Sequence, residues 1–407
     1  MNSQEDTEDW PMSTIGEQFK VQLGKRFDAA TNQGEPKLCM TNRGVRWGKI
    51  DPNETVMAPL TRQDISDLRL MVGDVLVCEG GEIGRASVWQ DELPECYYQN
   101  TLHRLRPNHD YQPRLLVAFL EQWAASGVLL GLVGKSSLAH LTKENLIRVP
   151  IPVPRRSEQA AIAEVLVDVD ELISKLERLI AKKQAIKQGM MQQLLTGRTR
   201  LPGFVDDWTI RRIGDFTQVR AGGTPSTSVA RYWGGDIPWM SSGEVHQKQV
   251  WNVRGRITKA GLHESSAQMF PPQTVLMALA GQGKTRGTVA ISRISLTTNQ
   301  SIAGIYPGDG HDSDYLYYNL DSRYAEMRGE SAGDGGRGGL NLTIIKALEI
   351  PFPGLDEQKA ISRILFDVDS GLQVLTARME KAESVKEGMM EQLLTGRTRL
   401  PAQEATA

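Results

Sequence analysis

The chain has 407 residues, 40% of them hydrophobic and 24% charged, and its formal net charge at pH 7 is −2. This length predicts more than one domain. The near-neutral charge argues against a protein that coats nucleic acid non-specifically, although it leaves room for a local basic groove. No apolar run approaches the roughly 20 residues of a membrane-spanning helix, and no N-terminal signal pattern is present.

The three cysteines, at positions 39, 78 and 96, are odd in number and widely spaced. They form neither a disulfide framework nor a zinc-binding spacing, which favours a reducing compartment. The six histidines are not paired at metal-ligand spacing. We therefore expect a cytoplasmic protein without a metal site.

Residues 1–150 form a first block with strand-like and turn-rich character. Short apolar runs punctuated by Gly and Pro at 72–80, 81–89 and 97–107 are typical of a twisted sheet. Residues 114–125 (RLLVAFLEQWAA) have a helical pattern, and the block ends in a short strand that leads into a long helical segment.

Residues 151–202 are the part of the chain that is most clearly duplicated. They return at 350–401 without a gap, and about half of the positions are identical. A repeat of this length predicts duplication of a half-protein. Each copy starts with prolines and a helix-start residue (Ser157, Asp356) and ends at a glycine (Gly197, Gly396) that can stop a helix.

Apolar residues seven positions apart predict a coiled-coil seam along each copy. A helix over 157–195 would be about 60 Å long at 1.5 Å per residue. Two such helices would most simply bury their apolar stripes against each other in antiparallel orientation; two unrelated amphipathic helices are the alternative. The residues expected in the coiled coil or in partner binding are Ile162, Val169, Leu172, Leu176, Leu179, Ile186 and Met190 in the first copy, and Ile361, Val368, Leu375 and Met389 in the second.

Residues 203–349 form a second block with the plan of the first. Gln99-Asn100 is echoed by Asn299-Gln300, and 315–327 stands where 114–125 stood. Residues 222–245 (GGTPSTSVARYWGGDIPWMSSGEV) have no clear counterpart. A shared scaffold with different loops is expected of two readers of different ligands, and drift after duplication also fits.

We therefore predict an α+β fold with a pseudo-twofold internal repeat. Two globular α/β domains, 1–150 and 203–349, would be joined by two long helical segments, 151–202 and 350–407, that form an antiparallel coiled coil.

Two motifs suggest catalysis, and both are incomplete. GQGKT at 281–285 resembles the end of a phosphate-binding loop, but Ala278 stands where the first glycine is required. Glu357 and Lys359 have the spacing found in metal-dependent nucleases, but the first copy has Ala160 in place of the lysine. Glu357 is better explained as a first-turn glutamate that favours the helix dipole. We expect a chain that is not an enzyme.

Polar and basic side chains recur on glycine-rich loops of both blocks. Arg, Lys, Asn, Ser and Thr are side chains that reach phosphates and base edges. The candidates for DNA contact are Asn42, Arg43, Arg46, Lys49, Arg85, Lys135, Ser136, Arg220, Thr224, Ser226, Ser241, Ser242, Lys284, Arg286 and Arg337.

The doubled helical element, with Glu-Gln near its start and GMM-x-QLLTGRTRLP at its end, resembles the specificity subunit of type I restriction-modification systems. The GGTPS…YWGGDIPW segment of the second block carries the same resemblance, and the first block lacks this motif. The resemblance implies a non-enzymatic protein with two target-recognition domains, each reading one half of a split DNA sequence. It also implies helices that set the spacing between the halves.

The partners that this resemblance implies are double-stranded DNA, two methyltransferase subunits, and endonuclease/translocase subunits. The methyltransferase subunits would bring S-adenosylmethionine and methylate adenine N6, so that this chain binds no cofactor itself.

Other functions remain open at the level of sequence. The same module could serve a methylation-only or other phage-defence complex, which the neighbouring genes would distinguish. A coiled-coil scaffold that joins two protein-binding domains predicts no DNA affinity. An enzyme built on GQGKT predicts nucleotide binding that Lys284→Ala abolishes.

Overall fold

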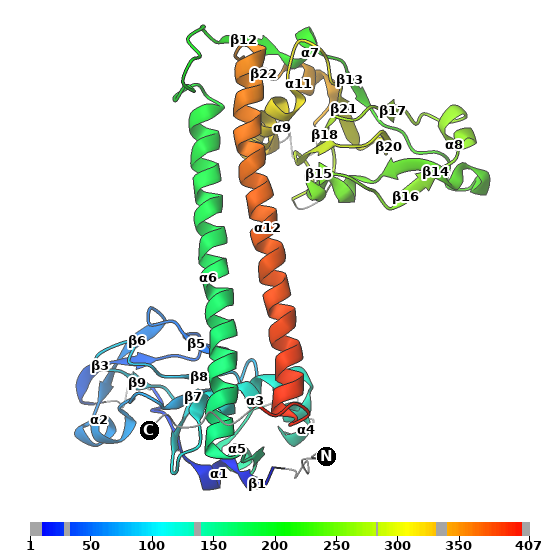
Figure 1. Cartoon of the computed structure of the whole chain (residues 1–407). Coiled ribbons are helices and arrows are strands. Elements are labelled where there is room, and N and C mark those ends of the chain that lie inside the picture. Colours follow the sequence, from blue (N-terminus) through cyan, green and yellow to red (C-terminus); the bar gives the residue numbers. More distant parts are fainter. Residues whose placement is uncertain (1–9, 28–32, 134–139, 282–283, 331–339, 401–407) are drawn as a thin grey trace, which may run out of the picture. The chain divides into compact units, whose positions relative to one another are not determined.

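The computed structural model describes residues 10–27, 33–133, 140–281, 284–330 and 340–400, and it divides into two compact units (Figure 1). Unit 1 comprises Met1–Glu177 and Ala377–Ala407, and unit 2 comprises Arg178–Thr376. The long helices α6 (Arg156–Leu194) and α12 (Leu355–Leu394) each contribute one part to both units. Among the described helices, none is long and apolar enough to cross a bilayer.

Unit 1 contains a four-stranded sheet in the order β2-β10-β7-β8, a three-stranded sheet β6-β3-β9, and the pairs β1-β11 and β4-β5. Its strands are β1 (Met12–Thr14), β2 (Phe19–Leu23), β3 (Glu35–Met40), β4 (Val45–Arg46), β5 (Lys49–Ile50), β6 (Thr55–Leu60), β7 (Val75–Cys78), β8 (Ala86–Val88), β9 (Tyr97–Tyr98), β10 (Leu102–Pro107) and β11 (Pro150–Pro152). Its shorter helices are α1 (Ile15–Gln18), α2 (Arg62–Leu68), α3 (Pro113–Ala125), α4 (Val128–Val133) and α5 (Lys143–Leu146).

Unit 2 contains a five-stranded sheet in the order β13-β21-β18-β19-β15, a four-stranded sheet β16-β14-β20-β17, and the pair β12-β22. Its strands are β12 (Thr209–Arg212), β13 (Val219–Ala221), β14 (Trp233–Met240), β15 (Gln249–Val250), β16 (Gly255–Ile257), β17 (Met269–Phe270), β18 (Val275–Ala278), β19 (Val289–Ser292), β20 (Leu296–Thr298), β21 (Ile302–Ile305) and β22 (Glu349–Phe352). Its helices are α7 (Ile213–Phe216), η1 (Ala230–Tyr232), η2 (Ser242–Gln247), α8 (Lys259–His263), α9 (Ser313–Ser322), α10 (Tyr324–Glu330) and α11 (Leu342–Ala347).

The two units share one strand topology, which confirms the predicted α+β repeat. The order β2-β10-β7-β8 corresponds to β13-β21-β18-β19, and in both runs all neighbours are antiparallel. The segment 222–245, which had no counterpart in the sequence, has one in the topology. Its strand β14 pairs antiparallel with β16 and parallel with β20, as β3 pairs antiparallel with β6 and parallel with β9.

Each unit has two hydrophobic cores because its central sheet is buried on both faces. Along β18, Val275 and Met277 face the core shared with the helices, whereas Leu276 and Ala278 face the core shared with the smaller sheet. This alternation follows from the two-residue period of a strand. The strand β7 divides in the same way between the two cores of unit 1.

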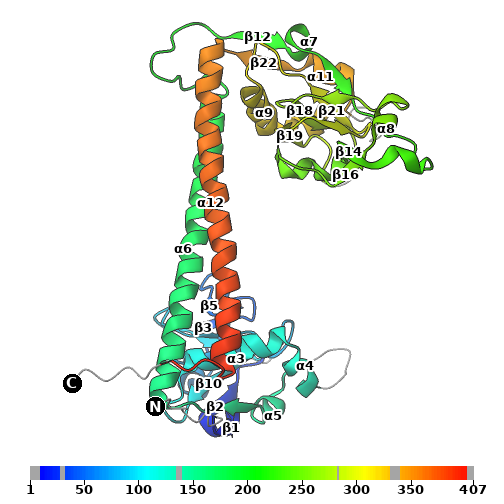
Figure 2. The ribbon, with the colours of Figure 1, turned by 45° about the vertical axis from the view of Figure 1, so that its right-hand side comes forward.

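Within each unit, the start of one long helix packs beside the end of the other, which makes the pair antiparallel (Figure 2). In unit 1, Ile162 and Leu166 of α6 share a core with Met390 and Leu393 of α12. In unit 2 the equivalent residues exchange helices: Ile361 and Leu365 of α12, with Met191 and Leu194 of α6.

The seam register differs from the prediction at three positions. Leu172, Leu179 and Ile186 are 49%, 47% and 49% exposed, so they do not lie in the seam. Spacings of three and four residues both keep side chains on one helix face, and only the partner helix decides which is buried. The buried or half-buried positions alternate by four and three, at Ile162, Leu166, Val169, Ile173, Leu176, Ile180, Lys183, Lys187, Met190 and Leu194 in α6, and at Ile361, Leu365, Val368, Leu372, Leu375, Met379, Ala382, Lys386, Met389 and Leu393 in α12.

Lys183 lies at a seam position that apolar side chains would normally occupy. It is accommodated by Gly371, where an added Cβ atom would meet the Lys183 ammonium nitrogen at 2.2 Å. The repeat places Leu172 and Ala382 at the corresponding positions of unit 1. In unit 2, the absence of a side chain at Gly371 of α12 therefore leaves room for Lys183 of α6.

The helix ends match the expectation that glycine stops both long helices. Gly197 and Gly396 follow the last turns with φ values of 70° and 69°, in the left-handed region that costs glycine no steric strain. The helices start one residue before the predicted start residues Ser157 and Asp356, since α6 begins at Arg156 and α12 at the equivalent Leu355. Ser157 and Asp356 therefore lie inside the first turn and do not cap it.

Two buried histidines predict that stability falls in weak acid. Burial lowers the pKa of His103, although its Nε2 lies 2.9 Å from the Leu141 carbonyl oxygen, and burial also lowers the pKa of His311. Both rings are therefore neutral in the folded chain and gain protons on unfolding, so stability is lost as the pH falls below about 6.5. Urea midpoints at pH 7.5 and 5.5 should differ less in the His103→Gln/His311→Gln variant than in the parent. An equal pH dependence in both proteins would contradict this.

Candidate nucleic-acid interface

A tryptophan, a glutamate and an arginine from three parts of the sequence join the ends of the long helices in each unit. In unit 2, the carboxylate of Glu357 accepts hydrogen bonds from Arg200 (Nε 2.7 Å, Nη2 2.8 Å) and from Trp208 Nε1 (2.9 Å). Glu357 lies in the first turn of α12, whereas Arg200 lies in the segment that follows α6. The Arg200 guanidinium also lies 5.4 Å from the Trp208 ring centroid. We call this group the clasp of unit 2.

The clasp of unit 1 has the same three residue types with the helices exchanged. Glu158 near the start of α6 accepts hydrogen bonds from Arg399 Nη1 (2.7 Å) and Trp10 Nε1 (3.0 Å). The second arginine of each Gly-Arg-Thr-Arg-Leu-Pro sequence therefore contacts the first turn of the other helix. This accounts for why the repeated Glu-Gln and Thr-Arg-Leu-Pro motifs match so closely.

The glutamine beside each clasp glutamate attaches the long helix to the globular part of its unit. Gln159 Oε1 accepts from the Gln112 backbone N–H (2.8 Å) at the start of α3, and its Nε2 donates to the Pro154 carbonyl oxygen (2.9 Å). Gln358 does the same with Asp312 and Pro353 (2.9 Å each). The loops of each unit are thus carried on a scaffold that is fixed to the helix starts.

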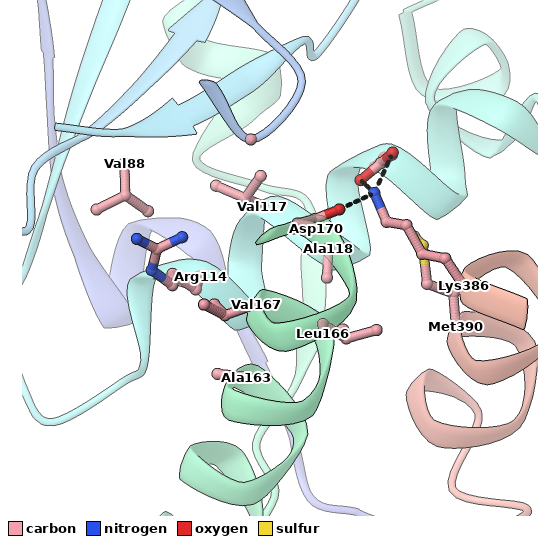
Figure 3. Close-up of a pocket in the computed structure, with 12 residues that line it drawn as sticks. Val88, Arg114, Val117, Ala118, Ala163, Leu166, Val167, Asp170, Lys386 and Met390 are labelled. Carbon is pink, nitrogen blue, oxygen red and sulfur yellow. Dashed lines mark hydrogen bonds and ion pairs between the residues drawn. The ribbon is translucent and has the colours of Figure 1, made fainter. Parts of the chain in front are cut away.

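A half-buried lysine at the seam, Lys386, strengthens this attachment in unit 1. Lys386 of α12 pairs with Glu121 of α3 (2.9 Å) and with Asp170 of α6 (3.0 Å), as Figure 3 shows for the Asp170–Lys386 contact. Burial acts to lower the pKa of Lys386, but the two carboxylates outweigh it and the pKa is raised. The lysine therefore remains charged and links three helices.

Unit 2 has an equivalent ion pair, because Lys187 corresponds to Lys386 and Asp369 to Asp170 at the repeat offset of 199 residues. Lys187 of α6 pairs with Asp369 of α12 at 2.6 Å, and the Tyr318 hydroxyl of α9 donates to the same carboxylate at 2.9 Å. In unit 1 the lysine links the globular part to both helices, whereas in unit 2 the Asp369 carboxylate makes this link, because it contacts both Lys187 and Tyr318.

The turn between β20 and β21 lies where the two sheets of unit 2 meet. It spans Asn299–Ile302 and is closed by a bond from Ile302 N–H to the Asn299 carbonyl oxygen (3.2 Å). Neighbouring backbone holds it from three sides, through Gly222 N–H to Ile302 O (3.0 Å), Gly223 N–H to Thr298 O (2.8 Å), Asn299 N–H to Met240 O (3.0 Å) and Leu279 N–H to Ser301 O (2.8 Å).

The turn between β9 and β10 in unit 1 is closed and held by the same set of bonds. Leu102 N–H donates to the Gln99 carbonyl oxygen at 3.0 Å. The four surrounding bonds are Gly24 N–H to Leu102 O (3.1 Å), Lys25 N–H to Tyr98 O (3.1 Å), Gln99 N–H to Met40 O (3.2 Å) and Glu79 N–H to Thr101 O (3.0 Å). A Cβ atom on Gly24 would lie 2.2 Å from the Gln99 carbonyl oxygen, so only glycine allows this approach.

Several predicted DNA contacts of unit 2 gather around its turn. Thr224 Oγ1 donates to Gln300 Oε1 (2.5 Å), and Ser242 Oγ accepts from Asn299 Nδ2 (3.4 Å). His246 Nε2 lies 3.2 Å from Thr285 Oγ1, and the neighbours of Thr285 in sequence are the exposed Lys284 and the half-buried Arg286.

Three other predicted contacts of unit 2, Ser241, Arg220 and Ser226, interact with residues outside the turn. Ser241 donates through its backbone N–H (3.1 Å) and its hydroxyl (3.3 Å) to Glu244 at the start of η2. Arg220 lies along β13 with its guanidinium 6.0 Å from the Tyr306 ring centroid. Ser226 shares a hydrogen bond with Ser228 (2.8 Å) on the exposed loop after β13.

Two tryptophans of the YWGGDIPW motif hold that loop in place. Trp233 Nε1 donates to the Ser226 carbonyl oxygen and Trp239 Nε1 to that of Gly223, each at 3.2 Å. The two rings contact edge to face with centroids 5.0 Å apart. The motif thus shapes the loop that borders the turn.

The predicted contacts of unit 1 lie on one basic hairpin and its support. Arg46 stands opposite Lys49 across β4 and β5, and exposed Arg43 precedes them. Arg46 also lies 3.6 Å from Asp51. Arg85 is engaged inside the fold, where it donates to the Asn42 carbonyl oxygen (2.8 Å) and pairs with Glu82 (3.3 Å).

The remaining predicted contacts, Lys135, Ser136 and Arg337, lie outside the described residues, as do Gln282 and Gly283 of the GQGKT segment. Within the described ranges, no group of three or more His, Cys, Asp or Glu side chains is placed to hold a metal ion. The turn residues themselves were not among the sequence candidates. The signal for them was the amide pair that recurs at 99–100 and 299–300.

Comparison with known proteins identifies the repeated architecture. A family described as "Type I restriction modification DNA specificity domain" matches twice, at residues 7–188 and 205–384. The MjaX specificity subunit of Methanocaldococcus jannaschii, described as a putative type I restriction enzyme subunit, is 23% identical over 97% of this chain and 94% of its own length. The type I restriction enzyme MjaIX specificity subunit of the same organism is 33% identical over 44% of this chain, a match that spans 42% of that relative.

Solved structures support the same fold. The type I restriction-modification S subunit from M. genitalium superposes with a TM-score of 0.65 at 14% identity, over 97% of this chain and 98% of that one. A chain from a study of complex assembly in a type I system gives 0.56 at 15% identity, with coverage of 96% and 98%. Because the two family matches together cover most of the sequence, this chain belongs to the type I restriction-modification DNA specificity family.

Proposed function

We propose that this chain reads a bipartite DNA target for a type I restriction-modification complex, one half-site with each unit. The observation that carries the proposal is the pair of equivalent turns, each held by the same four backbone bonds and bordered by different polar loops. A common scaffold places side chains at the same point, and the differing loops allow two different sequences to be read.

The long helices have two roles in this proposal, as a spacer between the half-sites and as a docking surface for two methyltransferase subunits. Exposed apolar side chains on both long helices support the docking role. They are Leu172, Leu179 and Ile186 of α6 and Phe366, Val374 and Val385 of α12, each of which is 38–54% exposed. A chain with an internal twofold repeat can bind two identical partners in equivalent ways.

In the proposed complex, the methyltransferase subunits bind S-adenosylmethionine and methylate adenine N6, and this chain binds no cofactor. Adenine N6 lies inside the base stack, so the partner must flip the base while this chain holds the flanking sequence. Endonuclease subunits would complete a restriction enzyme in the cytoplasm.

The test is long-read methylation sequencing of DNA from cells that express this chain with its cognate methyltransferase subunit. The expected result is a split motif with one N6-methyladenine in each half, on opposite strands. If the complex assembles and no new methylated motif is found, the proposal fails and a scaffold without DNA reading becomes the better account.

A further inference from the structure

Two carboxamides stand at the same corner of the two turns described above. Asn100 and Gln300 each follow the residue whose carbonyl oxygen closes the turn, so each is the second residue of a four-residue turn. Backbone bonds from three neighbouring segments hold each corner. An amide at this point is presented from a fixed backbone and not from a free loop tip.

The preceding amide in each turn is used internally. Asn299 Nδ2 donates to Ser242 Oγ (3.4 Å), and its Oδ1 accepts from the Ser301 backbone N–H (3.2 Å). Gln99 Nε2 donates to Thr101 Oγ1 (2.7 Å). These first amides stabilise their turns, which leaves the second amides for recognition.

Gln300 is exposed and oriented. Thr224 Oγ1 donates to its Oε1 (2.5 Å), which fixes the oxygen end of the carboxamide and leaves its two N–H groups and one oxygen lone pair available. Asn100 is half-buried, and no other described residue hydrogen-bonds to its carboxamide. Both residues can therefore offer a donor and an acceptor side by side.

This pair of groups matches the edge of one base. In the major groove, adenine presents N7 as an acceptor and N6–H₂ as a donor, and Asn or Gln pairs with both. We propose that Asn100 and Gln300 are specificity-determining residues, each of which selects an adenine in its own half-site, and that Thr224 positions Gln300. The assignment rests on the proposed function.

The surroundings of Gln300 suit a DNA strand. Lys284 is exposed five residues after Leu279, whose N–H donates to the Ser301 carbonyl oxygen of the turn (2.8 Å). Glu244 is occupied by the backbone N–H groups of Ser241 (3.1 Å) and Arg254 (3.0 Å). In unit 1 the nearby Asp64 is paired with Lys25 (2.9 Å). These two carboxylates near the turns are therefore engaged within the protein.

The experiment uses the full chain with its cognate methyltransferase subunit. The parent's methylated motif is determined first, and Gln300→Ala, Asn100→Ala, Gln300→Glu and Thr224→Val are then compared. Gln300→Ala should relax one A·T position in one half-site, with discrimination reduced about 5- to 150-fold, the equivalent of 1–3 kcal/mol for a bidentate pair. Asn100→Ala should do this in the other half-site only. Each variant serves as the matched control for the other.

Gln300→Glu separates recognition from a structural role. A glutamate accepts from cytosine N4–H₂ and cannot donate to adenine N7, so preference at that position should move from adenine to cytosine. Thr224→Val should relax the same position as Gln300→Ala, because it removes only the orienting hydroxyl.

The outcomes distinguish this inference from the proposed function. An unchanged motif in both alanine variants of an active complex overturns the assignment and leaves the proposed function in place. A parent complex that methylates no split motif removes both. If Gln300→Ala abolishes methylation at both half-sites, the near-isosteric Gln300→Glu decides: a shifted base preference supports the assignment, and an unshifted preference overturns it.

Discussion

Replacing Arg200 by alanine should lower the free energy of unfolding of unit 2 by about 3 kcal/mol, because it leaves the carboxylate of Glu357 buried without its cation. The Glu357 side chain is only 2% exposed, and among the described residues Trp208 Nε1 would remain its one hydrogen-bond donor. Thermal unfolding of the whole chain, monitored by hydrogen exchange in peptides from unit 2, measures this effect.

Two further variants test the cause. Arg198 is exposed two residues away, and Arg198→Ala should change stability by less than about 0.5 kcal/mol. Adding Glu357→Gln to Arg200→Ala removes the unpaired charge and should restore part of the loss. Equal stability of the Arg200→Ala and Arg198→Ala chains would rule out the clasp as a stabilising group. Arg399→Ala should cost less in unit 1, where the Glu158 side chain is 12% exposed.

Adding one heptad to both long helices should lengthen the DNA spacer and leave both half-sites unchanged. The insertion points are the equivalent bonds Arg178–Leu179 and Ala377–Arg378, which lie at the boundary between the units. A heptad preserves the seam register and adds about 10 Å. At about 3.4 Å per base pair, this corresponds to about three base pairs. Methylation sequencing reads the new spacer directly.

The matched control inserts the heptad into α6 alone. This insertion shifts one part of α6 by a heptad relative to α12, so that the contacts between the two helices are lost in one of the units. Methylation should therefore be lost. A spacer that stays the same length in the double insertion, or half-sites that change, would exclude the helices as the element that sets the spacing.

The sequence repeat predicted the architecture because duplication acts on both halves at once. It revealed the helix pair, the glycines that end the helices and the strand-rich blocks before any contact was known. The choice between Leu172 and Ile173 as the seam residue could not be made from one stripe, since both spacings lie on one helix face. The second copy indicates Ile173, because it has an apolar residue, Leu372, at the position equivalent to Ile173 and Gly371 at the position equivalent to Leu172.

Side-chain roles were harder to predict than elements. Arginine is a residue type typical of DNA contacts, but the Arg85 guanidinium donates to the Asn42 carbonyl oxygen inside the fold. The clasp residues Glu357 and Arg200 lie 157 positions apart, and local pattern does not indicate that they meet. Asn100 and Gln300 were visible only as an echo between the halves. Their position at a turn between two sheets depends on backbone pairings distant in sequence.

The way in which the units divide the chain has a consequence for the order in which they can be completed during synthesis. Unit 2 is one continuous stretch, Arg178–Thr376, so all of its residues are available once that stretch has left the ribosome. Unit 1 is made first but takes Met390, Leu393 and Leu394 of its core from the far end of the chain. The domain that is translated first is therefore finished last, and a transcript cut short after unit 2 leaves the earlier domain with an open core.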